Sequence, residues 1–148
     1  MIMAEFIFYA CGAGFIIYEF MCVFDPGGRY DSNRRMALDI SQPEGVRSSA
    51  YHRNLARKSL ILIVSTVWLM GGLFTGEWPL FVAMLLAANA GGSIVLGPLR
   101  DAGMRRWYCV SLSAISAFCL ALSILALANR LHLHIDMTGI LMDWAGLR

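Results

Sequence analysis

The first 24 residues carry two carboxyl groups, Glu5 and Glu19, in an otherwise apolar segment. Their spacing of fourteen residues corresponds to about 21 Å along a helix and brings the side chains to within about 40° of one direction. The hydrocarbon core of a bilayer is about 30 Å thick, so in a membrane-crossing helix at least one carboxyl, most simply Glu19, lies inside it. Gly12 lies midway on this stripe, which must therefore face protein or water rather than lipid.

Two interpretations of Glu19 follow from this position. In the functional one, Glu19 handles a proton or an ion inside the membrane. In the structural one, it pairs with an Arg, hydrogen-bonds to Ser and Asn of neighbouring helices, or causes local thinning of the bilayer. The structural interpretation is favoured, because the other apolar segments contain no second charged group in their interior and proton relays need partners.

Small and polar residues recur at helical spacing in two later apolar segments. Asn89 and Ser93 lie one turn apart and supply polar groups within the membrane. Rows of small residues let helix backbones approach closely, and Asn can hydrogen-bond between helices, so packing is favoured over a transport site or a water-lined wall. The predicted packing residues, besides Gly12, are Ala83, Ala87, Gly91, Gly92, Ser116 and Ser123.

Motifs for metal binding and catalysis are weak. His132, His134 and Asp136 could chelate a metal from an extended strand, but on a helix only His132 and Asp136 share a face. Zinc needs three or four ligands, so we predict no metal, and the role of these three residues stays open. All four cysteines fall in apolar segments as small apolar residues. The sequence contains no P-loop, G-x-S-x-G or H-E-x-x-H, so we predict neither an enzyme nor a cofactor.

Composition sets the class of protein that must hold these groups. Of the 148 residues, 58% are hydrophobic and 15% are charged, against roughly 45–50% and about 25% in soluble domains. A soluble chain of this size could not bury so much apolar surface, and disorder needs the opposite composition. Four cysteines do not make a disulfide scaffold, and a net charge of +2 does not indicate a nucleic-acid partner.

Hydropathy predicts an all-α integral membrane protein, with residues 1–148 forming a single four-helix membrane domain. A membrane-crossing helix needs about 20 mostly apolar residues. The Gly76 turn between the second and third segments predicts an antiparallel hairpin. The predicted transmembrane helices span about 3–24, 59–76, 78–99 and 107–128.

The distribution of Lys and Arg predicts the orientation. Residues 25–58 carry seven of these cations and residues 100–106 carry three, leaving Arg130 and Arg148 for the opposite side. By the positive-inside rule, both basic loops are cytoplasmic and both termini lie outside. The first segment lacks the basic start of a signal peptide and is predicted to be retained. We expect a bacterial inner membrane.

Two amphipathic segments flank the predicted helices. Within the basic loop 25–58, residues 46–58 are expected to form a helix on the anionic inner leaflet, with a solvated loop as the alternative. The external tail 129–148 is expected to form a helix at the interface or on a partner, through Met137, Ile140, Leu141 and Trp144. The predicted headgroup contacts are Arg47, Arg53, Arg57 and Lys58.

These features favour a non-catalytic multi-span subunit of a larger membrane assembly, such as a secretion, conjugation, respiratory or phage-encoded complex. Its partners would be the lipid bilayer and other membrane subunits or further copies of itself. The second and third helices would dock through the face of Ala83, Ala87 and Gly91. The alternatives are a homo-oligomeric pore, holin-like in size and number of spans, and a small ion-coupled transporter that uses Glu19.

Overall fold

The computed structural model describes residues 2–47, 49–96 and 102–147, without the side chains of 92–96 and 102. The described chain is helical and contains no strand, which confirms the predicted all-α class. Its α-helices are α1 (Ile2–Phe24), α2 (Pro26–Ser41), α3 (Tyr51–Gly72), α4 (Trp78–Leu96), α5 (Arg105–Ala128) and α6 (Met137–Trp144).

Three helices in the described part of the chain are long and apolar enough to cross a membrane. They are α1, α3 and the continuous helical segment Arg105–Leu133, which comprises α5 and a π-helical extension. The apolar part of α4 is shorter, Trp78–Gly91. The end of the segment predicted at 78–99 falls outside the described residues, so the fourth crossing stays a prediction.

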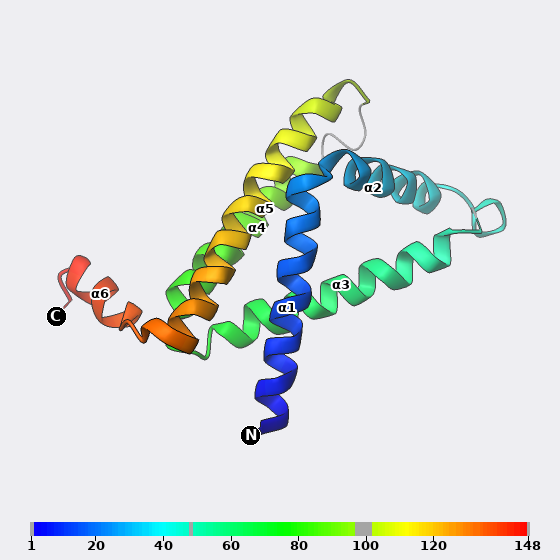
Figure 1. Cartoon of the computed structure of the whole chain (residues 1–148). Helices are drawn as coiled ribbons and strands as arrows, with labels where there is room; N and C mark the ends of the chain where they lie inside the picture. The colour runs from blue at the N-terminus through cyan, green and yellow to red at the C-terminus, as the bar shows by residue number, and fades with distance from the viewer. Residues whose placement is uncertain (1, 48, 97–101, 148) are drawn as a thin grey trace.

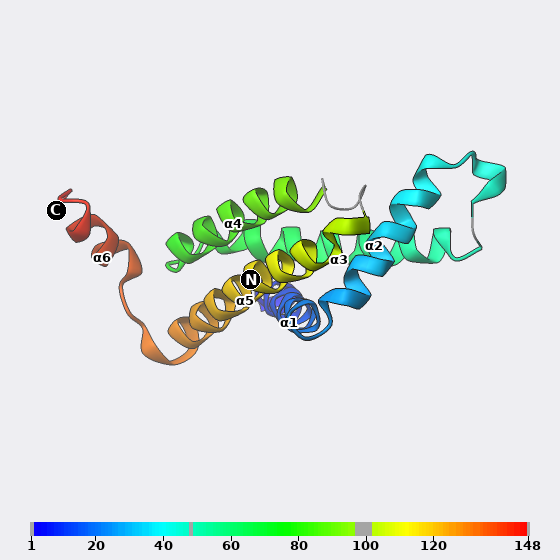
Figure 2. The same ribbon diagram turned by 90° about the horizontal axis from the view of Figure 1, so that it is seen from above.

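The long helices form an open arrangement. α4 and α5 run side by side, and α1 packs against both α3 and α5 (Figure 1). α3 crosses α1 obliquely, and α3 and α4 diverge from the turn that joins them (Figures 1 and 2). The predicted hairpin therefore exists at its turn, but its two helices do not pack together along their length.

A tryptophan joins the four long helices. Trp68 of α3 is 1% exposed, and a Cβ at Gly12 of α1 would lie 2.5 Å from its Cζ3 atom. The indole N–H donates to Ser123 Oγ on α5 at 3.2 Å, and that hydroxyl lies 3.2 Å from the sulfur of Met84 on α4. Only a glycine at position 12 lets the ring lie against the α1 backbone.

Much of the predicted basic loop 25–58 is helical, because α2 lies within it. The Asp25 carboxylate accepts a hydrogen bond from the Gly28 N–H at 3.0 Å, and Pro26 follows at the first helical position. Asp as N-cap and Pro at the first turn are standard helix starts. The Asp-Pro-Gly-Gly motif thus ends one helix and begins the next.

The prediction of a separate amphipathic helix at 46–58 is wrong, because most of this segment belongs to a longer helix. A short 3₁₀ turn covers Glu44–Val46, and α3 begins at Tyr51 and continues without a break to Gly72, so it starts earlier and ends earlier than the predicted 59–76. Arg53, Arg57 and Lys58 consequently occupy the first turns of a candidate membrane-crossing helix. Leu, Ala, Arg and Lys are good helix formers, so nothing separates the basic turns from the apolar ones.

The C-terminal tail contains the expected helix, α6, although its position at an interface is not tested. The π-helix Asn129–Leu133 ends at His134, whose φ of 51° is left-handed and whose N–H donates to Asn129 O at 2.8 Å. Asp136 then caps α6 by accepting from the Gly139 N–H at 2.9 Å. His134 and Asp136 thus have structural roles at helix ends. The described residues include no group of three His, Cys, Asp or Glu suited to a metal.

Candidate functional site: an intramembrane cavity at Glu19

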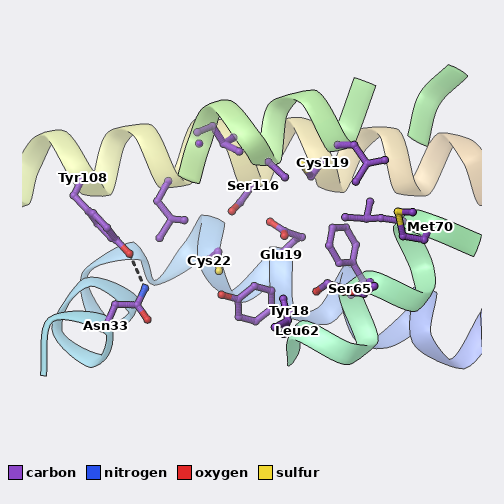
Figure 3. A pocket seen from close by; sticks show the side chains of 18 residues that line it. Tyr18, Glu19, Cys22, Asn33, Leu62, Ser65, Met70, Tyr108, Ser116 and Cys119 are labelled. Carbon is purple, nitrogen blue, oxygen red and sulfur yellow. Dashed lines mark hydrogen bonds between the residues drawn. The ribbon is translucent and has the colours of Figure 1, made fainter. Parts of the chain in front are cut away.

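A cavity of about 450 Å³ lies between α1, α3, α4 and α5 and reaches Asn33 of α2 at one end (Figure 3). It exists because α3 crosses α1 obliquely and diverges from α4, which leaves space that the side chains do not fill. Its volume falls within the range of about 300–1,000 Å³ that is usual for small-molecule sites.

Glu19 is the only carboxyl among the described lining residues of this cavity. The residue is 9% exposed, and its carboxyl group lies against the hydroxyl of Ser116, which is 2% exposed (Figure 3). The ion pairs of the described residues do not include Glu19. The structural interpretation of Glu19 predicted either an arginine partner or a hydrogen bond to Ser or Asn of a neighbouring helix. The structure shows the contact with a serine and no ion pair with an arginine among the described residues.

The remaining wall combines aromatic rings, hydroxyl groups and thiols. Phe15 and Tyr18 come from the same helix as Glu19, and Ser65 faces the cavity from α3. Cys22 and Cys119 are buried free thiols in the wall. These groups can accept or donate single hydrogen bonds, but none carries a charge opposite to that of an ionised Glu19.

One end of the cavity is closed by side chains from three helices. The Asn33 amide of α2 donates to the Tyr108 hydroxyl of α5 at 2.6 Å (Figure 3). Lys58 of α3 in turn donates to the Asn33 side-chain oxygen. Tyr30 packs edge-on against the Tyr108 ring, with their centroids 5.0 Å apart. This closure depends on α2, which the sequence analysis missed.

The cavity opens sideways between α3 and α4. Leu62 and Met70 of α3 line it and are 67% and 47% exposed, and Thr66 and Ala88 are also exposed lining residues. In a membrane-crossing chain such side chains face lipid. The rim is therefore uncharged and, apart from the Thr66 hydroxyl, apolar, and it lies at the level of the helices rather than at their ends.

A second cluster of charges lies at the other end of the helices, around Arg130. Its guanidinium lies 3.8 Å from Glu77 and 4.0 Å from Glu5, and its Nε donates to the Tyr9 hydroxyl at 2.5 Å. Asn129, which is 1% exposed, donates to Glu77 at 3.2 Å. Glu5 and Glu19, which share a stripe of α1, thus belong to separate sites. Glu5 can be identified from the sequence as a carboxyl in an apolar segment, but its partners cannot.

Several of the predicted packing residues contact other helices of the same chain. Gly91 faces Ile115 of α5, with 2.8 Å between the place of a Cβ and the Ile115 Cδ1, and Ala87 packs on the core. Ser116 and Ser123 are buried, Ala83 is half-buried and Asn89 is exposed on α4. The side chain of Ser93 and the surroundings of Gly92 lie outside the described residues. Gly91 thus faces α5 within the chain, and docking of the Ala83, Ala87 and Gly91 face on a partner stays a prediction.

Neither a protein-family model, nor a curated protein, nor a solved structure matches this chain.

Proposed function

We propose that the chain is a small, ion-coupled membrane carrier in which Glu19 takes up and releases a proton in exchange for a cation. The observation that carries the proposal is a buried carboxyl that lines a cavity of about 450 Å³ between apolar helices. Carboxyl groups are costly inside a membrane, and they typically mark ion and proton pathways there. A carboxylate can be neutralised by either a proton or a cation, so the two compete for one site.

The cavity also favours the carrier over the homo-oligomeric pore. A homo-oligomeric pore would use polar groups on an outer face, where copies of the chain could line a common path. Glu19 and Ser116 instead lie inside a single chain. The cavity that holds them is closed at one end by Asn33 and Tyr108. This arrangement favours a site that holds one ligand over a continuous channel.

Exchange in proteoliposomes tests the proposal. Vesicles with a pH-sensitive dye inside would carry an imposed pH gradient, and Na⁺, K⁺ or an organic cation would be added on the other side. The native chain and a control, Glu44→Gln in an exposed 3₁₀ turn, should dissipate the gradient in the presence of one of these cations. Glu19→Gln should abolish this exchange. Equal rates for the native chain and Glu19→Gln would contradict the proposal.

A second candidate function is the non-catalytic subunit of a larger membrane assembly, and α6 favours it. This helix projects away from the others (Figure 1) and is tied to α4 by the hydrogen bond from Trp78 Nε1 to Thr138 Oγ1 at 2.8 Å. Trp144 is 87% exposed and Ile140 57% exposed. An apolar helix face held in a fixed place suits either a partner helix or the lipid interface.

Extraction of the tagged chain in a mild detergent tests this second candidate. Mass spectrometry of the intact complex would give its subunits and their stoichiometry. A subunit should retain other membrane proteins. The two single variants Ile140→Ser and Trp144→Ser should release them. A chain that remains alone, or a partner that both variants retain, would contradict docking through α6.

A further inference from the structure

The lateral rim of the Glu19 cavity indicates how a ligand reaches it. The exposed lining residues are Leu62 and Met70 of α3 and Ala88 of α4, the two helices that diverge from their shared turn. The end of the cavity near α2 is closed by the Asn33–Tyr108 hydrogen bond, and Lys58 lies just behind it. A cation arriving from that end would meet the positive charge of Lys58, whereas the lateral rim carries no charged side chain among its described residues.

The interior of the cavity indicates the chemistry of the ligand. It presents one carboxyl, Glu19, and the rings of Phe15, Tyr18 and Tyr108. Aromatic faces attract cations, and quaternary ammonium groups are bound in this way. Only one unit of positive charge can be balanced, because the described lining contains no second acidic side chain. The rest of the wall is mainly apolar and suits a hydrocarbon or aromatic body.

We propose that the cavity binds a compact lipophilic organic monocation, which reaches Glu19 from the bilayer through the opening between α3 and α4. The proposal rests on the proposed carrier function and names its substrate class. An inorganic cation fits less well, since Na⁺ or K⁺ would have to replace its water shell with one carboxyl and a few hydroxyl groups behind an apolar rim. A molecule that already partitions into the membrane needs no such exchange of ligands.

Equilibrium binding to the full chain in nanodiscs tests this inference. The probe is radiolabelled trimethyl(4-phenylbutyl)ammonium, which is permanently charged, and the competitor is its neutral isostere with carbon in place of the ammonium nitrogen. Empty nanodiscs correct for partitioning into lipid. The native chain should bind the probe saturably, Glu19→Gln should weaken binding at least about tenfold, and the isostere should not compete. Equal binding by Glu19→Gln, or effective competition by the isostere, would overturn the inference.

A matched pair of substitutions on α4 tests the lateral route without altering the carboxyl. Ala88 lines the opening and is exposed, whereas Ala90 is exposed on the same helix but does not line the cavity. Both positions can accept a larger side chain without overpacking the core. Ala88→Phe should slow probe association at least about tenfold if it blocks the route, and Ala90→Phe should leave it unchanged. Identical association rates for the two variants would contradict the lateral route.

The exchange assay separates failure of the inference from failure of the proposed function. Glu19-dependent exchange of protons for Na⁺ or K⁺, without binding of the organic probe, would leave the carrier in place and refute the substrate class. Glu19-dependent exchange for the organic cation would support both. Absence of exchange with every cation, together with absence of probe binding, would refute both.

Discussion

At the scale of single residues, the site depends on where α1 places its few uncommon side chains. Gly12 and Glu19 lie on one stripe and are both buried, but they have different tasks. Gly12 admits the ring of Trp68 against the α1 backbone, which fixes how α1 and α3 cross. Because the cavity forms where these helices cross, Gly12 positions Glu19 without touching it.

Gly12→Leu should therefore disrupt the crossing, because its Cβ alone would lie 2.5 Å from Trp68 Cζ3. Overpacking of this kind typically costs about 1–3 kcal/mol. The matched control is Ala13→Leu, one residue further along on the exposed side of α1. Thermal unfolding in detergent should show a lower midpoint for Gly12→Leu and no clear change for Ala13→Leu. Equal midpoints for the two variants would show that the Trp68 contact does not fix the crossing.

At the scale of elements, a partly buried charge cluster links α1, the turn between α3 and α4, and the π-helix that follows α5. Arg130 lies between Glu5 and Glu77, and the side chain of Glu77 is only 10% exposed. A buried carboxylate that loses its partner is strongly destabilising, because its desolvation is no longer compensated. This cluster holds the ends of the helices together opposite the Asn33 closure.

Arg130→Gln should consequently lower the free energy of unfolding by on the order of 3 kcal/mol. Adding Glu77→Gln should recover part of this loss, because the unpaired buried charge is then removed. Arg53→Gln, at an exposed position of α3, is the control and should have little effect. Chemical unfolding in detergent micelles would measure all four chains. A double variant no more stable than Arg130→Gln alone would show that the Arg130–Glu77 pair is not the origin of the loss.

The sequence allowed the apolar helices to be located but not their mutual arrangement. Runs of apolar residues predict α1 and α5 closely, because a membrane-crossing helix needs continuous hydropathy. α2 is polar and was missed, although Asp25 and Pro26 form a helix start. Glu19 was identified as a residue in a costly place, but its cavity depends on the oblique path of α3, which no local pattern records. Arg130 and Glu77 are 53 positions apart, so their contact was equally hidden.

At the scale of the whole molecule, the helices surround a site that is polar in one place and apolar elsewhere. Its charged ends, the Arg130 cluster and the Lys58–Asn33 contact, lie apart from the cavity rim between α3 and α4. This division suits a chain in which ligands move within the bilayer while the helix ends stay fixed. This division requires that α4 cross the membrane together with the three longer apolar helices.

The positions of the two termini test the number of crossings. Four crossings place the N- and C-termini on the same side, whereas three place them on opposite sides. Reporter fusions to each end, green fluorescent protein for the cytoplasm and alkaline phosphatase for the exterior, would report the side in bacteria. We expect phosphatase activity and no fluorescence at both ends, with a reporter inserted at Gly45 showing the reverse. Opposite results at the two termini would favour three crossings and contradict the orientation proposed here.

The proposed function and its substrate class both require that Glu19 be a protonatable carboxyl that can be reached from the lipid. A hydrophobic carbodiimide reacts with protonated carboxyl groups and partitions into membranes, so it tests both properties at once. Mass spectrometry of the labelled chain should find the adduct on Glu19 and not on Glu5 or Glu77, and the organic cation should protect against it. A water-soluble carbodiimide should label Glu19 poorly. Absence of the hydrophobic adduct at Glu19, or labelling that the cation leaves unchanged, would contradict the account.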